Sequence, residues 1–123
     1  MRRRSGELLA LESQILAVAL DALVGGTPEV HGFAVAKQVA DREGSRRLTS
    51  HGTLYKALAR LEDAGLLSSR WEDHHAAEEA GRPRRRLYRI TSSGQVELAA
   101  QLARDEAAAI EPRTALGRGV HPA

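Results

Sequence analysis

The chain has 123 residues and no cysteine, which fits one small domain with an appendage and excludes disulfide frameworks, thiolate zinc sites and cysteine nucleophiles. Its 18 basic and 16 acidic side chains leave a formal net charge of only +2. No apolar run approaches the length of a membrane span, and no cleavable signal follows the basic start. We therefore expect a cytoplasmic protein that contacts no membrane.

Three helices are expected in the first half of the chain. Residues 5–24 repeat apolar side chains at helical spacing, in a stripe wide enough to cover more than one buried face. A shorter helix follows over residues 33–42. The third helix begins after Thr49 or Ser50, either of which can cap it, and it closes at Gly65.

From residue 66 onward the period of the pattern changes to two. Residues 66–71 and 87–90 predict two short strands joined by a long loop. Ser92 and Gln95 have capping-box spacing and open a last helix that ends just before Pro112. The order predicts a mainly α fold with a small β-hairpin, a winged helix-turn-helix followed by a C-terminal dimerisation helix.

The chain divides into three predicted parts. A winged helix-turn-helix DNA-binding domain spans residues 5–90 and a dimerisation helix spans residues 91–111. A disordered tail, rich in proline, glycine and arginine and without a period, spans residues 112–123.

The small net charge hides an uneven distribution. Residues 72–79 carry four acids and no arginine or lysine, a charge of −4, whereas residues 80–90 carry five arginines and no acid, a charge of +5. Clustered arginines suit the phosphate backbone of a nucleic acid, because neutralised phosphates release counterions. The alternative left open is a solvated hairpin, in which these arginines pair with Glu72, Asp73, Glu78 and Glu79.

The third helix adds independent support for DNA. With its leucines inward, the first half of its outer face carries Gly52, Thr53 and Lys56. A helix that enters the major groove by its N-terminus needs such small, polar and basic residues. Free backbone amides near Ser50 and His51 would also attract a phosphate. Together with the arginine-rich hairpin, this face favours binding of double-stranded DNA.

Six segments occur in an informative order: residues 15–20 (ILAVAL), 30–33 (VHGF), 48–62 (LTSHGTLYKALARLE), 64–67 (AGLL), 81–84 (GRPR) and 88–91 (YRIT), followed by Gly94. In this order and spacing the chain resembles the PadR family of bacterial transcriptional regulators over about residues 7–98.

The resemblance implies a homodimer that represses transcription from a palindromic operator and dimerises through its first and last helices. It implies DNA contacts from Thr53, Tyr55 and Lys56 and, in the wing, from Arg82 and Arg84. The single terminal helix is similar to that of short-tailed members, some of which bind flat aromatic drugs between subunits. This terminal helix carries no aromatic residue, and Phe33 stands where members usually have Tyr. A small-molecule effector therefore stays open as a partner of unknown identity.

The predicted DNA contacts lie on the third helix and the wing, with Thr53 and Lys56 at the bases and Tyr55, Arg60 and the wing arginines at phosphates. The full set is Ser50, His51, Gly52, Thr53, Tyr55, Lys56, Arg60, Arg82, Arg84 and Arg85.

The predicted dimer contacts lie on the first and last helices, because no later element covers the apolar stripe of the last helix. They are Leu8, Leu9, Ile15, Val96, Ala99, Leu102, Ala103 and Ile110.

Nothing in the sequence indicates an enzyme or a cofactor. Adjacent pairs such as Ser50 and His51 lack an oriented acid, and the glycines form no phosphate-binding loop. Two other functions stay open. One is a winged-helix protein–protein module that uses the acidic loop without DNA. The other is a metal-responsive regulator through His74 and His75, although no nearby third ligand has suitable spacing, so we predict no metal site.

Overall fold

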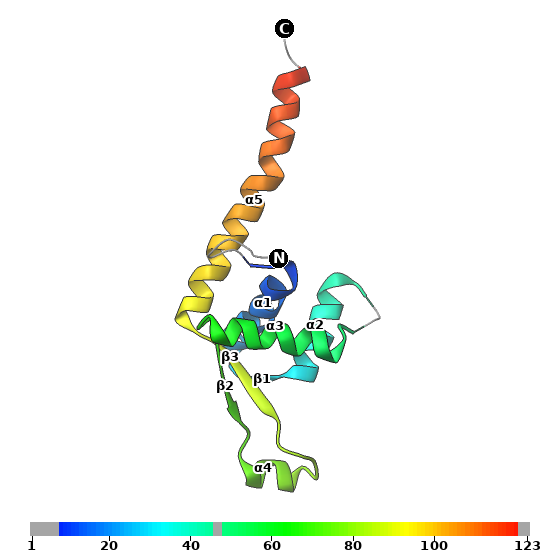
Figure 1. Ribbon diagram of the computed structural model, residues 1–123, viewed down its shortest axis with the longest axis vertical. Helices are drawn as coiled ribbons and strands as arrows, with labels where there is room; N and C mark the ends of the chain where they lie inside the picture. The colour runs from blue at the N-terminus through cyan, green and yellow to red at the C-terminus, as the bar shows by residue number, and fades with distance from the viewer. Residues whose placement is uncertain (1–7, 46–47, 121–123) are drawn as a thin grey trace.

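A bundle of helices carries a long two-stranded wing in the computed structural model, which describes residues 8–45 and 48–120, with side chains as far as Ile110. No helix in these ranges is long and apolar enough to cross a membrane. The mainly α winged-helix prediction is confirmed. The elements in chain order are α1 (Ala10–Val24), β1 (Val30–His31), α2 (Gly32–Glu43), α3 (His51–Asp63), β2 (Leu67–Trp71), α4 (His74–Glu79), β3 (Arg86–Ile90) and α5 (Ser92–Val120) (Figure 1).

The core forms where the apolar faces of α1, α2 and α3 meet the base of the wing. Leu16 of α1 and Leu58 of α3 are completely buried, and Leu98 brings the first turns of α5 into the same cluster. Leucine, valine and alanine provide nearly all of this core, as the shortage of aromatic residues requires. The inward leucines fix which face of α3 remains available to a partner.

The wing belongs to a three-stranded antiparallel sheet in the order β1–β3–β2. Val30 of β1 pairs with Tyr88 of β3. On the other side of β3, β2 pairs in an antiparallel register that runs from Leu67 opposite Ile90 to Trp71 opposite Arg86. The sequence pattern missed β1 because two residues are too short to show a period. This strand anchors the start of α2 directly to the base of the wing.

Side-chain caps define the starts of three helices. Ser50, one of the two expected candidates, accepts the Thr53 N–H at the start of α3. His31 Nδ1 accepts the Ala34 N–H at the start of α2. At α5 the Thr91 hydroxyl accepts the Gly94 N–H, so the cap is Thr91 rather than the predicted Ser92. Thr91 also donates to the Gly65 carbonyl and so ties α5 to the turn after α3.

Two expectations about irregular segments were wrong. The loop between the wing strands contains the short helix α4, which lies at the tip of the wing (Figure 1). α5 does not end before Pro112 but continues to Val120, well into the segment 112–123 that we expected to be disordered; residues 121–123 lie outside the described residues. Proline removes one backbone hydrogen bond, and the alanine-rich turns before it favour continuation of the helix.

Two glycines in helices have opposite surroundings. A Cβ on Gly94 would collide with the Leu66 backbone carbonyl, whereas a Cβ on Gly52 would meet open space. We expect Gly94→Ala to lower the free energy of unfolding by about 1–3 kcal/mol, since backbone cannot move aside cheaply. Gly52→Ala is the matched control and should raise the free energy of unfolding by about 0.5 kcal/mol. Urea denaturation followed by circular dichroism measures both, and equal effects of the two substitutions would contradict the packing of α5 on Leu66.

Candidate nucleic-acid interface

A concave surface of about 500 Å³ lies where the starts of α2 and α3 face the wing. α2 contributes Gly32 and Phe33, α3 contributes His51 and Tyr55, and β1 contributes His31, its last residue. The wing contributes Trp71, Arg84, Arg85 and Arg86. We call this surface the aromatic–arginine groove; it combines rings with positive charge at the end of α3 that the sequence predicted to meet DNA.

The N-terminal half of α3 presents the expected mixture of side chains. Gly52, Thr53 and Lys56 are all exposed. Ser50 has a structural role, because its hydroxyl caps the helix and donates to the Thr53 hydroxyl at 2.8 Å. A helix start with exposed small and polar residues can approach the edges of bases closely.

Tyr55 packs differently from the prediction. Its ring stacks at a tilt on His51, with 4.4 Å between the centroids, and it covers Gly32 so closely that a Cβ there would strike the phenol oxygen. The side chain is half-buried against the core. Tyr55 therefore joins α3 to the start of α2, and Gly32 is the residue that leaves room for this contact.

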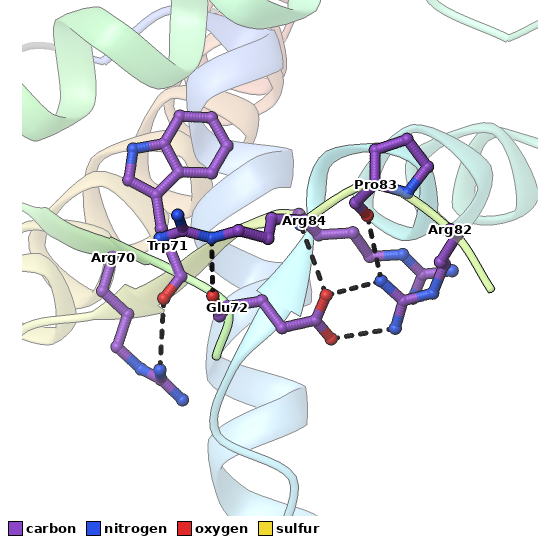
Figure 2. A network of polar contacts seen from close by, with 7 residues as sticks. Arg70, Trp71, Glu72, Arg82, Pro83 and Arg84 are labelled. Atoms are coloured by element: carbon purple, nitrogen blue, oxygen red, sulfur yellow. Dashed lines mark hydrogen bonds and ion pairs between the residues drawn. The ribbon is translucent and has the colours of Figure 1, made fainter. Parts of the chain in front are cut away.

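The wing is held in shape by an ion pair between Glu72 and Arg82 (Figure 2). Both carboxylate oxygens of Glu72 accept from the Arg82 guanidinium, with 2.8 Å between Oε2 and Nη2, and the Arg85 N–H also donates to Oε1. The Arg82 guanidinium, helped by the Arg85 N–H, lowers the pKa of Glu72 to about 2. The side chains are only 14% and 27% exposed. We call this pair the wing clamp.

The wing clamp corrects the prediction for Arg82. Its guanidinium is occupied by Glu72 rather than available to a phosphate, so the solvated-hairpin alternative describes this arginine correctly. The pairing could not be read from the sequence because ten positions separate the partners and four acids compete for five arginines.

Arg84 and Arg86 gather around Trp71, which is 53% exposed. Their guanidinium carbons lie 5.7 and 5.2 Å from the centre of the indole ring, within the range of a cation–π contact. Arg84 also donates to the Glu72 carbonyl, and Figure 2 shows its side chain lying alongside Trp71. The ring thus holds two arginines in place on the wing side of the groove.

A second ion pair spans the sheet, between Arg70 and Glu29. The Arg70 guanidinium donates to both carboxylate oxygens of Glu29, at 2.6 and 2.7 Å. This contact lowers the pKa of Glu29 and raises that of Arg70. Because Glu29 precedes β1 and Arg70 lies on β2, the pair ties the two outer strands together across β3.

Arg60 departs most clearly from its predicted role. Its Nε donates at 2.9 Å to Oε2 of Glu12, a carboxylate on α1 with no exposed surface. The expectation of a phosphate contact from this nitrogen was wrong, because the buried acid of another helix takes it. Forty-eight positions separate the partners, so no local pattern could reveal the pair.

His31 lies at the back of the groove as a helix cap. Partial burial lowers the pKa of its imidazole, and the nearby charges of Arg85 and Arg82 act in the same direction. The neutral form is also the form that the cap requires, since Nδ1 accepts the Ala34 N–H. His31 therefore serves as the side-chain cap of α2.

The predicted dimer residues divide by exposure. Ile15 is only 1% exposed in the core and offers no surface to a partner, so that prediction was wrong. The wide stripe on α1 is used inside the monomer. Leu8 is partly buried against the core. The other six are exposed, namely Leu9, Val96, Ala99, Leu102, Ala103 and Ile110.

The two adjacent histidines lie on α4, at the tip of the wing. Their nearest acid is Glu78, with 3.9 Å from His74 and 4.0 Å from His75. Among the residues that the structure describes, no three potential metal ligands come together. The arrangement gives the metal-responsive hypothesis no supporting geometry.

Five residues that line the groove were not among the predicted contacts, namely His31, Gly32, Phe33, Trp71 and Arg86. Phe33 and Trp71 are large apolar side chains left mostly exposed by the fold. Their position depends on how α2 packs beside the wing. The available signal was weak: they are two of only four aromatic residues, and the helical period places Phe33 in line with Ala36 and Ala40, which are buried.

The wing clamp predicts that the stability of the wing depends on pH. Because the pKa of Glu72 falls from 4.5 to about 2 on folding, the clamp's stabilisation is fully present above pH 4.5 and is lost as the pH falls toward 2. Trp71 is the only tryptophan, so its emission reports on the wing while circular dichroism reports on the helices. At pH 7, Glu72→Gln should already show the altered emission of the loosened wing.

Glu79→Gln, which changes an exposed acid on α4, is the matched control and should leave the emission unchanged. A midpoint near pH 4.5 in the wild-type emission, with the helices intact, would contradict the clamp.

Comparison with known proteins identifies the family. The model of the "Transcriptional regulator PadR-like family" matches residues 21–100. A transcriptional regulator from Clostridium thermocellum is 21% identical with a TM-score of 0.67, covering 85% of this chain and 87% of that one. A PadR family transcription regulator from Clostridium difficile is 25% identical with a TM-score of 0.59, covering 86% and 95%.

Bacillus subtilis PadR, solved in complex with operator DNA, is 21% identical with a TM-score of 0.58, and the match covers 76% of this chain but only 48% of that one. Among the curated proteins no relative matches. Since the family model covers well over half of the sequence, the chain belongs to the PadR-like family of transcriptional regulators.

Proposed function

We propose that this regulator binds a palindromic operator in double-stranded DNA as a homodimer and represses transcription by occupying it. The observation that carries the proposal is the aromatic–arginine groove, which sets the exposed Arg84 and the partly exposed Arg85 and Arg86 of the wing opposite the exposed start of α3. In winged helix-turn-helix proteins these two elements straddle one strand of the duplex. Bacillus subtilis PadR, which shares the fold, was solved with operator DNA.

In this proposal α3 enters the major groove by its N-terminus. Gly52 permits close approach, and Thr53 and Lys56 provide a hydroxyl and a cation to the base edges. The first amides of α3 and the ring of His51 face the adjacent phosphate. Tyr55 supports this arrangement from behind, through its contacts with His51 and Gly32.

The wing would hold the phosphate backbone through Arg84 and Arg85, with Arg86 beside them. Trp71 supports the guanidinium groups of Arg84 and Arg86 by cation–π contact, which reduces the side-chain entropy lost on binding. Arg82 contributes by holding the wing in shape through Glu72. The acidic residues of α4 lie at the tip of the wing, where they would be repelled by phosphate and therefore face away from the duplex.

Dimerisation would use α5 together with the start of α1. α5 extends away from the rest of the domain beyond its first turns (Figure 1). Leu102 and Ile110 are about half exposed on it, and Leu9 is exposed at the start of α1. In the part of the chain that the structure describes, no element covers Leu9 or Leu102, and a second copy of α5 would bury them. A transcriptional regulator works where the chromosome lies, so the cytoplasm remains the expected location.

Selection of bound duplexes from a random pool tests the proposal. We expect an inverted repeat whose half-sites are about 10 bp apart, one turn of DNA, because a two-fold dimer presents two α3 helices. Leu102→Glu should dissociate the dimer in analytical ultracentrifugation and lower affinity for the repeat at least tenfold, since the second half-site no longer contributes. Val24→Glu, at an exposed position near the end of α1, is the control. Failure to enrich any duplex would favour the protein–protein module instead.

The salt dependence of DNA affinity distinguishes an arginine that contacts phosphate from one that only holds the wing in shape. Each phosphate contact contributes about 0.9 to the slope of log affinity against log salt. Arg84→Gln and Lys56→Gln should therefore each reduce the slope by about one. Arg82→Gln should weaken binding through the shape of the wing and leave the slope nearly unchanged. Arg42→Gln removes an exposed arginine paired with Asp21, outside the groove, and should change neither quantity; an undiminished slope in Arg84→Gln would contradict backbone contact by the wing.

A further inference from the structure

The pair formed by Glu12 and Arg60 joins the helix that would meet a partner chain to the helix that would meet DNA. Arg60 lies near the end of α3, about one turn after Lys56 and two turns after Gly52. Glu12 lies in the first turn of α1, and its side chain has no exposed surface. A buried carboxylate needs a charged partner in good geometry, so the pair constrains the relative placement of the two helices strongly.

The same end of α1 is held to α5. The Leu9 N–H donates to Oε1 of Glu12 at 3.0 Å, and the adjacent Leu8 N–H donates to Oε1 of Gln101 at 2.9 Å. Gln101 is only 8% exposed, and its amide nitrogen donates to Asp105 one turn further along α5. Through the backbone that joins Leu8 to Leu9, these hydrogen bonds connect Gln101 with Glu12 and Arg60. We call this connection the Gln101–Arg60 path.

The outer end of this path lies within the surface that would face a partner. Leu9 is 45% exposed and Leu102, next to Gln101, is 53% exposed. A shallow cavity of about 360 Å³ opens beside them and is lined by Leu8, Gln101, Leu102 and Asp105 together with residues of α1 and Arg42 of α2. A second chain packed on Leu9 and Leu102 would therefore lie next to the backbone N–H groups of Leu8 and Leu9, which bind Gln101 and Glu12.

We propose that Glu12 and Arg60 are positioning residues, which hold α3 at a fixed placement relative to the α1–α5 dimer surface and so set selectivity for the operator. This inference rests on the proposed function. Operator recognition needs two α3 helices at one separation and one angle, whereas non-specific binding needs only positive charge near phosphate. Loss of the pair should therefore reduce affinity for the operator more than affinity for an unrelated duplex.

The test compares Glu12→Gln, Arg60→Gln and the double substitution on the selected duplex and on a scrambled duplex of equal length. Each single variant should reduce the ratio of the two affinities about tenfold, a usual size for coupling between sites. The double variant should lose no more than either single variant, because both substitutions break one contact. The salt slope on the scrambled duplex should stay at the wild-type value. Asp63→Asn, which changes an exposed acid at the same end of α3, is the control and should leave the ratio unchanged.

Two further variants keep the proposal testable if Glu12→Gln does not fold. Arg60→Lys retains a donor with a positive charge and should recover part of the ratio that Arg60→Gln loses. Gln101→Ala cuts the path at α5, far from any DNA contact, and should also lower the ratio.

Four results would overturn the proposal. A merely structural pair would lower both affinities by the same factor and leave the ratio unchanged. A phosphate contact would make Arg60→Gln lose about one from the salt slope while Glu12→Gln stays like the wild type. A wild-type protein that enriches no duplex would remove the proposed function and this inference together, whereas normal wild-type selection with unchanged variants would remove the inference alone.

Discussion

The burial of one face of α3 is the constraint on which the rest of the molecule depends. Leu54, Leu58 and Leu61 are almost completely enclosed by α1, α2 and the base of the wing. A 13-residue helix fixed along that stripe can present only one surface outward. The first half of that surface faces solvent beside the wing, and the second half is held to α1 by Arg60. Hydrophobic packing therefore decides which polar side chains can meet a partner.

The arginines show how position gives one residue type several tasks. Arg82 and Arg60 each form an ion pair with a carboxylate that the fold places beside them, and both pairs have a structural role. Arg84 instead lies against Trp71, a partner without charge, so its positive potential is not cancelled. Arg86 lies against the same ring but also pairs with Glu62 at 3.8 Å. A wing with five unpaired arginines would repel itself, whereas the wing clamp and the pair of Arg86 with Glu62 offset two of these charges.

Features of the fold that depend on neighbouring residues could be predicted from the sequence, whereas contacts between distant elements could not. The helices of the first half, the wing strands and the fold class follow from periodicity, which is local, and from caps such as Ser50. The exposed residues Gly52, Thr53 and Lys56 follow from the same helical phase. The pairings of Arg60 and Arg82 depend on distances between elements, and the burial of Ile15 depends on how many helices surround α1. These contacts between elements form only when the helices and strands pack together, so composition and residue spacing could not reveal them.

The two surfaces of the proposed function lie on opposite sides of a single packed core, and this arrangement limits how they can influence one another. Between the exposed leucines near Gln101 and the start of α3 lie only close-packed aliphatic side chains and the Gln101–Arg60 path. Packed interiors transmit displacement poorly by gradual deformation but hold distances well. In the proposed dimer, the surface formed by α1 and α5 would therefore act on DNA recognition by fixing the geometry of α3 rather than by moving it. An effector that altered the angle between the two subunits would change the separation of the two α3 helices, and so affinity for the operator, without any rearrangement inside a subunit.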